Sequence, residues 1–128
     1  MVTYSLPFRW AADHRRVKEL LVDGVDLALL PRDITIEALV DTLKNGNVGE
    51  RRDAARTIGL FGPLAKDTVP VLIEAINDES LFVRKDVVWT LGKIGPMAKS
   101  AVPALKNALE DPIVRSRAEE ALRRITGD

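Results

Sequence analysis

Apolar residues recur at steps of three and four along much of the chain, the spacing that places them on one face of an α-helix. The clearest example ends at Ile94, and its charged residues Arg84 and Lys93 fall off the apolar face. That face is made by Val83, Val87, Val88, Leu91 and Ile94. Gly95 and Pro96 follow directly, and these two residue types end helices. The pattern predicts an all-α chain.

The helical pattern repeats every 33 residues. Residues 51–78 and 84–111 are identical at 13 of 28 aligned positions. Upstream, residues 36–43 match residues 69–76, and downstream, residues 114–125 match 83–94 after a connection two residues shorter. Each unit contains two helices, and such units bury their apolar faces by stacking on one another. We therefore expect about three and a half antiparallel helix pairs in one stack.

The most similar part of the repeat is GPLAKDTVP (62–70), which returns as GPMAKSAVP (95–103). Glycine accepts the left-handed backbone geometry past a helix end, and proline cannot continue the helix. We interpret both glycine–proline corners as joints between two helices. The second helix of each pair is expected to begin at Asp67 or Ser100, which are good N-cap residues, with a proline in its first turn.

The same corners invite two functional interpretations. The segment GPMAKS (95–100) ends like a phosphate-binding loop, but such a loop needs a second glycine directly before the lysine and a preceding strand. Gly59 with Gly62 and Gly92 with Gly95 form a G-x-x-G spacing that can clamp a nucleic-acid backbone. We expect instead that the first glycine of each pair lets two helices pack closely.

The repeat resembles a known family. The residues that carry the resemblance are Asp78, then Val83-Arg84, an apolar helix, Gly92-x-x-Gly95 and Val102-Pro103-x-Leu105. They look like HEAT-type repeats, most like the short subtype named after phycobilisome lyases, over about residues 34–126. The resemblance implies a right-handed α-solenoid with first helices on the convex side and second helices on the concave side.

The chain departs from this family pattern at three places. Asn45 stands where Asp is usual, Glu50 stands where Val is usual, and the connection 111–115 is shortened. These departures leave open whether the Asp-to-Arg pairing between repeats forms at either end. We divide the single domain 1–128 into a divergent N-terminal cap (1–33), core repeats (34–112) and a C-terminal capping helix (113–128). Within the cap, residues 13–30 are expected to form a helix.

Composition and charge remove several classes of function. The chain has 19 basic and 19 acidic residues, so no global field attracts it to nucleic acid or to an anionic membrane. It has no cysteine, and its one histidine, His14, stands among charged residues at an expected helix start. We expect no catalytic residue, no metal and no cofactor. The absence of a signal peptide and of a membrane-spanning run favours a cytoplasmic location.

These observations predict a non-catalytic scaffold that binds another protein. A first alternative comes from the resemblance, because the family includes lyases that attach bilins, and implies a lyase-like or accessory protein acting on a chromophore protein. A second alternative is a helical repeat that binds nucleic acid, based on basic clusters at 51–56 and 115–124. Acidic residues interleave with both clusters and weaken them.

We expect the partner to bind on the second helices, at positions off their apolar stripes. Aligned by the repeat, these positions are Ala38, Val71 and Ala104, then Asp41, Glu74 and Asn107, then Lys44, Asn77 and Glu110. Small side chains thus stand beside acidic and amide groups. The predicted contact residues are Asp41, Glu74, Asn107, Val71 and Ala104, and they suit a partner carrying basic residues. An ordinary solvated helix face is the competing interpretation.

An aromatic pair marks a second candidate surface. Phe82 and Trp89 are seven residues apart and so share a helix face, roughly opposite the core stripe. Trp89 stands where the neighbouring repeats carry Arg56 and Glu120. Such a residue suggests a covered site. The cover could be a partner protein, a second copy of the chain in a homodimer, or the aromatic N-terminal segment 4–10.

Overall fold

A computed structural model describes residues 35–127 of the chain, and the secondary structure in this range is entirely helical. Its α-helices are α2 (Ile36–Asn45), α3 (Val48–Phe61), α4 (Val69–Ala75), α5 (Leu81–Ile94), α6 (Val102–Ala108) and α7 (Arg115–Thr126). Two 3₁₀ segments, η3 (Gly62–Thr68) and η4 (Gly95–Ala101), join α3 to α4 and α5 to α6. The predicted all-α solenoid is confirmed. The predicted cap 1–33, with its helix 13–30, lies outside the described residues.

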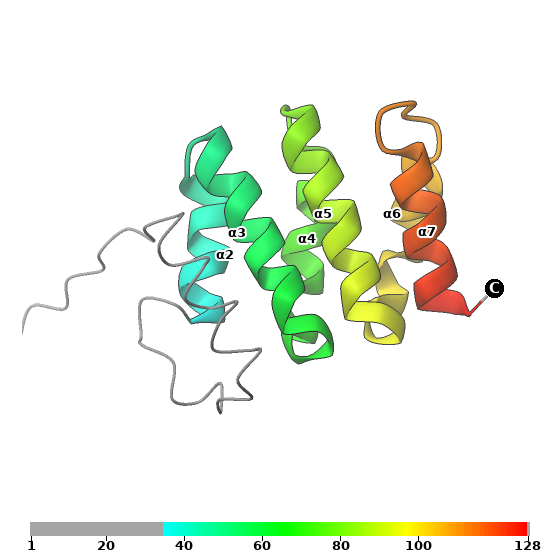
Figure 1. Cartoon of the computed structure of the whole chain (residues 1–128), viewed down its shortest axis with the longest axis horizontal. Helices are drawn as coiled ribbons and strands as arrows, with labels where there is room; N and C mark the ends of the chain where they lie inside the picture. Colours follow the sequence, from blue (N-terminus) through cyan, green and yellow to red (C-terminus); the bar gives the residue numbers. More distant parts are fainter. Residues whose placement is uncertain (1–34, 128) are drawn as a thin grey trace, which may run out of the picture.

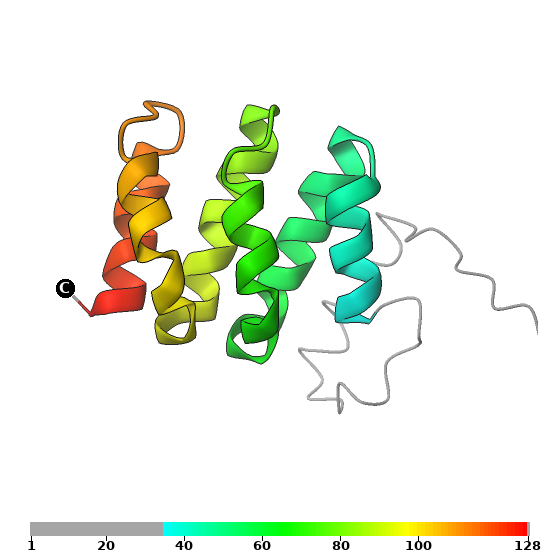
Figure 2. The same ribbon diagram turned by 180° about the vertical axis from the view of Figure 1, so that it is seen from behind.

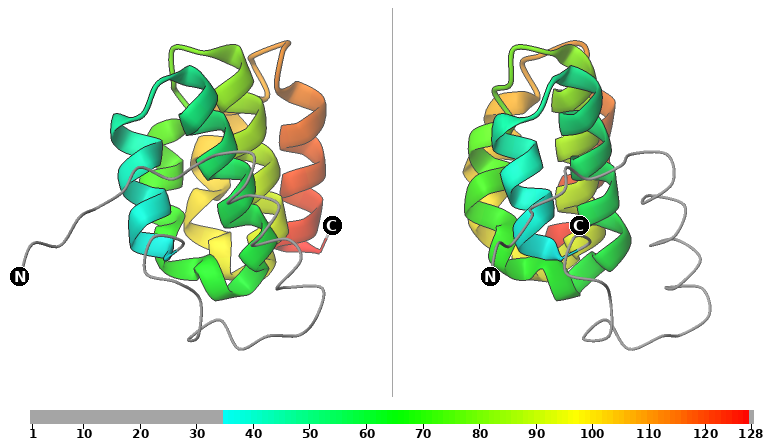
Figure 3. Two further views of the ribbon diagram at one scale, coloured as in Figure 1. Left: turned by 60° about the vertical axis from the view of Figure 1, so that its left-hand side comes forward. Right: turned by 90° about the vertical axis from the view of Figure 1, so that its left-hand side faces the viewer.

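The helices form two layers. The first helices of the pairs, α3, α5 and α7, lie side by side in one layer, and the second helices α2, α4 and α6 form the other (Figures 1 and 2). Seen from the end of the stack, the layers face each other across a single interior (Figure 3). Successive units therefore add to the stack along one direction, as the sequence repeat requires.

The core fills the space between the layers. All five apolar residues of the predicted stripe on α5 are buried, from Val83 to Ile94. On the second helices, Leu39, Leu72 and Leu105 occupy equivalent positions and are each 0% exposed. Because these leucines recur at the repeat period, one pattern of packing is used three times. The predicted core is confirmed in the described residues.

The start of α3 explains why Glu50 departs from the family pattern. The Asn47 side chain accepts a hydrogen bond from the Glu50 backbone N–H at 2.9 Å, and the Glu50 side chain accepts one from the Asn47 N–H at 2.9 Å. This reciprocal pair is a capping box, which satisfies two N–H groups at a helix start. A valine could not form it.

The glycine–proline corners are joints, as predicted. Gly62 and Gly95 have φ angles of 57° and 75°, a left-handed geometry that residues with a Cβ adopt poorly. The prediction that Asp67 and Ser100 cap the second helices is wrong. Each 3₁₀ segment runs directly into its helix, so the residue before α4, Thr68, is already helical and makes no side-chain cap. Its hydroxyl donates instead to the Ala65 carbonyl at 2.7 Å.

Close helix approach accounts for the first glycine of each pair. A Cβ built on Gly59 would lie 2.5 Å from Cζ3 of Trp89, and one on Gly92 would lie 3.2 Å from Cα of Ala121. The buried Thr90 hydroxyl donates a hydrogen bond at 2.6 Å to the carbonyl of Ala55, one turn before Gly59. This bond joins α5 to α3. The expectation that these glycines permit close packing is confirmed.

Asp-to-Arg pairing forms in both complete helix pairs. Arg84 donates from Nε to Asp111 at 3.1 Å, although the connection after Asp111 is shortened, and Arg51 pairs with Asp78 in the same way. Arg115, the next equivalent, pairs with Glu119 one turn along its own helix at 3.6 Å instead. The pairing therefore stops at the C-terminal end of the stack.

Candidate partner-binding faces

The second-helix face is the outward surface of α2, α4 and α6, and it carries the three predicted columns. Asp41, Glu74 and Asn107 are exposed, whereas Val71 and Ala104 are partly buried beside them. Asp41 accepts a hydrogen bond from the Asn45 side chain at 2.9 Å. The structure therefore places large polar groups at the rim of this face and small apolar groups deeper.

Two hollows mark this face, one between α2 and α4 and one between α4 and α6. The first has a volume of about 460 Å³. It is lined by Leu43, Lys44, Val71, Glu74, Ala75, Asn77 and Asp78. The second has a volume of about 360 Å³. Its lining includes Ile76, Asn77, Ala104, Asn107, Ala108, Glu110 and Asp111, together with Arg84 and Val114.

The two hollows occupy equivalent positions in successive repeats, but their polar residues differ, since Glu74 and Asn77 correspond to Asn107 and Glu110. Every residue that lines the first has its equivalent 33 positions later in the lining of the second. Asn77 belongs to both, because α4 forms one wall of each. Most residues of the sequence columns line these hollows, whereas Ala38 and the predicted contact residue Asp41 do not; those that do are Lys44, Val71, Glu74, Asn77, Ala104, Asn107 and Glu110. The columns did not indicate the hollows themselves, which depend on how far apart neighbouring second helices lie.

The hollows carry acidic groups that are open to a partner. Glu74 and Glu110 are exposed, and neither forms an ion pair with another described residue. Asp78 and Asp111 line the same hollows, but Arg51 and Arg84 bind their carboxylates. In each hollow, one carboxylate is thus held in an ion pair within the fold, and a second carboxylate can contact a partner.

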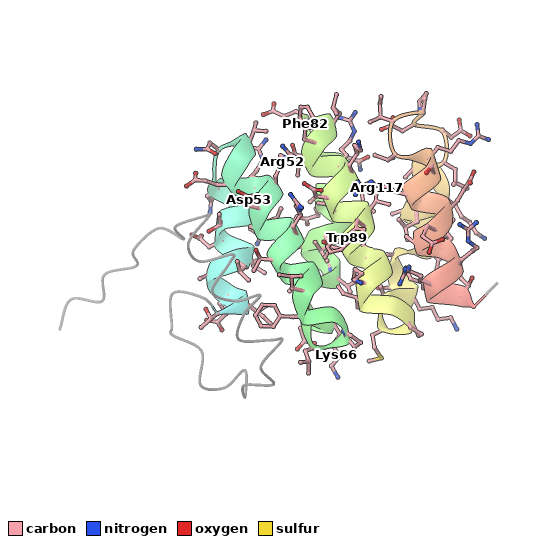
Figure 4. All side chains as sticks on the ribbon, viewed as in Figure 1. Arg52, Asp53, Lys66, Phe82, Trp89 and Arg117 are labelled. Carbon is pink, nitrogen blue, oxygen red and sulfur yellow. The ribbon has the colours of Figure 1, made fainter. Side chains whose placement is uncertain are left out.

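The first-helix face is the outward surface of α3, α5 and α7, and it carries both predicted aromatic residues (Figure 4). Phe82 is 49% exposed, and the Arg52 guanidinium lies over its ring, 4.8 Å from the centroid. Trp89 is partly buried, with the Lys93 ammonium 5.5 Å from its ring centroid. Part of the cover over Trp89 comes from the chain itself, since its ring packs on Gly59. A homodimer through these residues remains a prediction.

Charged residues separate Phe82 from Trp89. Asp86, one turn after Phe82, is 7% exposed and lies 3.3 Å from Arg52 and 4.0 Å from Arg117. It therefore joins α5 to both neighbouring helices of its layer. Burial raises the pKa of its repeat equivalent Asp53 to about 6, against the opposing effect of Arg56 and Arg52.

No group of His, Cys, Asp and Glu side chains in residues 35–127 is arranged to hold a metal ion. None of the helices in that range combines the length and the apolar character needed to cross a bilayer.

Comparison with known proteins agrees with the architecture. The family model for HEAT repeats matches residues 36–123. This range contains helices α2 to α6 and most of α7. The match is to HEAT repeats in general and does not reach the phycobilisome-lyase subtype. No curated protein matches the chain. With paired helices at a 33-residue period and a family match over most of its length, the chain belongs to the HEAT-repeat family.

Proposed function

We propose that the chain is a non-catalytic protein-interaction module that binds its partner on the second-helix face. HEAT repeats commonly mediate protein–protein interaction, which supports the general role. The observation that carries the choice of face is the pair of equivalent hollows, one helix repeat apart. A surface with a hollow at the same position of two successive repeats suits an elongated partner that makes contact at two points.

The lining defines the chemistry of this partner. Ala75 and Ala108 provide small apolar floors, while Glu74 and Glu110 present carboxylates at the openings. Apolar side chains on the partner would fill the floors, and lysine or arginine residues would pair with the carboxylates. Asn77, shared by both hollows, can donate and accept hydrogen bonds to the partner between them. We infer a helix or extended segment with basic residues at both points of contact.

The two alternatives receive less support. The basic clusters proposed for nucleic-acid binding are largely paired within the protein, since Glu120 holds Arg123 and Arg124, Asp78 holds Arg51, and Asp86 lies beside Arg52. These pairs reduce the charge left to contact phosphates. The lyase-like alternative rests on the resemblance alone.

Affinity capture followed by mass spectrometry tests the proposal. Wild type is compared with Glu74→Lys and Glu110→Lys, which reverse one carboxylate in each hollow. Asp67→Lys is the matched control, because Asp67 is an exposed acidic residue outside both hollows, on the 3₁₀ segment η3. We expect the same partner to be lost or depleted in both hollow variants and kept in the control. Equal recovery with all four proteins would refute the assignment of this face.

A further inference from the structure

A third hollow, of about 160 Å³, opens on the first-helix face between α5 and α7. Its walls include Trp89, Gly92 and Lys93 from α5, and Arg117, Glu120 and Arg124 from α7. The helices α5 and α7 belong to the layer opposite α2, α4 and α6 (Figures 1 and 2), between which the two hollows of the second-helix face lie. The third hollow shares no lining residue with those two hollows.

The internal repeat explains why this hollow exists. Between α3 and α5 the equivalent position is occupied, because the Trp89 ring packs directly on Gly59. Between α5 and α7 the equivalent glycine is Gly92, and the residue corresponding to Trp89 is Glu120. The nearest atoms to a Cβ on Gly92 belong to Ala121 and Arg124, with no aromatic ring among them. The hollow thus lies where the preceding unit has the Trp89 ring, and we call this position the seat.

Glu120 does not fill the seat, because arginines of its own helix hold its carboxylate. Arg123 Nη2 lies 2.6 Å from one carboxylate oxygen, and Arg124 Nε lies 3.0 Å from the other. Hydrogen bonds from Arg123 and Arg124 lower the pKa of Glu120, so it stays ionised. These contacts hold the Glu120 side chain against its own helix, α7.

The remaining charge around the seat is positive. Lys93 is exposed and forms no ion pair with a described residue. The Arg117 side chain is 41% exposed, lies 4.0 Å from Asp86 and donates a hydrogen bond to the Lys85 carbonyl at 3.5 Å. With Arg124 offset by Glu120, these two cations leave the surroundings able to attract carboxylates.

We propose that this hollow binds an aromatic side chain within an acidic segment of a partner protein. The ring takes the place over Gly92 that Trp89 takes over Gly59, and carboxylates next to it in the segment pair with Lys93 and Arg117. Two cations, Lys93 and Arg117, are few for a continuous polyanion, whose binding depends on many phosphate contacts. An acidic peptide with one aromatic residue suits the site better than a nucleic acid does.

Amide NMR spectra of the full chain test this directly. The probe is the peptide acetyl-Glu-Glu-Phe-Glu-Glu-amide, and the matched probe replaces its phenylalanine with alanine. We expect the first peptide to shift the Gly92 amide and the Trp89 indole N–H signals, and the alanine peptide to shift them much less. Lys93→Gln should weaken binding about fivefold, whereas Lys106→Gln, an exposed lysine on α6, should not.

A filled-seat variant supplies the sharpest check. Glu120→Trp restores the aromatic residue of the preceding unit at a half-exposed side chain, and it should abolish the shifts. If this variant does not fold, the affinity of Lys93→Gln and the shifts caused by the alanine peptide still test the proposal. The proposal is wrong if both peptides bind alike, if folded Glu120→Trp binds like wild type, or if the shifts map to α4 and α6. It is also wrong if a single-stranded oligothymidylate shifts these signals at lower concentration than the peptide does.

Discussion

Arg51 and Asp78, 27 residues apart in sequence, form a two-point pair, with Nε to Oδ2 at 3.0 Å and Nη2 to Oδ1 at 3.1 Å. A third donor of Arg51 reaches the Gly46 carbonyl at 3.0 Å. One side chain thus links the start of α3 to the end of α4 and to the turn that precedes α3. Arg84 is placed similarly but makes a one-point contact, with Nε donating to Asp111 at 3.1 Å and Nη1 donating to the Asp78 carbonyl at 3.0 Å.

Arg51→Lys is expected to lower the free energy of unfolding by about 1–2 kcal/mol, measured by urea denaturation. Lysine keeps the charge but cannot contact both carboxylate oxygens and the carbonyl in one plane. The control is Arg115→Lys. Arg115 is the repeat equivalent, but its side chain is 68% exposed and, among residues 35–127, pairs with Glu119 alone. Its replacement should therefore change stability by less than about 0.5 kcal/mol. Equal effects in the two variants would show that the planar pairing is not what matters.

Gly59→Ala should destabilise the protein by about 1–3 kcal/mol, although alanine favours helices. The new methyl group would overlap the Trp89 ring and approach the Thr90 hydroxyl at 2.9 Å. Gly49→Ala is the control, because the nearest atom to its Cβ is 3.5 Å away, and it should be neutral or stabilising. In a double-mutant cycle, Trp89→Leu should recover much of the loss. Additive effects would place the strain elsewhere than at Trp89.

Asp53→Asn is expected to stabilise the protein at pH 8 but not at pH 4. The pKa of this carboxyl is about 6 in the folded chain, against an ordinary value of 3.8. A raised folded-state pKa gives stability that is fully present below pH 3.8 and is lost as the pH rises through 6. For a fully buried group this change is worth about 3 kcal/mol, and solvent screening of the partly buried Asp53 reduces it to about 1 kcal/mol. Thermal or urea unfolding of both proteins from pH 4 to 8 measures the difference, and a constant difference would contradict the prediction.

Much of the fold follows from local pattern. The 33-residue period and the three- and four-residue spacing identified the helix pairs, because burial of one helix face fixes which positions are apolar. Asp67 and Ser100 misled because good N-cap residues matter only where a helix starts from extended backbone, and here a 3₁₀ segment precedes it. The sequence does not show that a 3₁₀ segment runs without interruption into the following helix.

The candidate sites were less predictable. Outward positions such as Glu74 could be assigned from periodicity alone, but the hollows depend on spacing between helices that are distant in sequence. The same holds for Trp89. The pattern of its own helix predicts an outward side chain, but its ring packs on Gly59 of another helix. The equivalence of Gly59 and Gly92 is visible in the sequence. Their different surroundings are not, because they depend on where the Trp89 ring lies.

Carboxyl footprinting of the full chain, free and bound to the captured partner, tests the central claim most directly. This labelling reports which exposed carboxylates the partner covers. We predict that Glu74 and Glu110 lose labelling together in the complex, while the exposed Glu119 on α7 is labelled as before. Unchanged labelling of Glu74 and Glu110, with protection confined to carboxylates of α3, α5 and α7, would contradict the account.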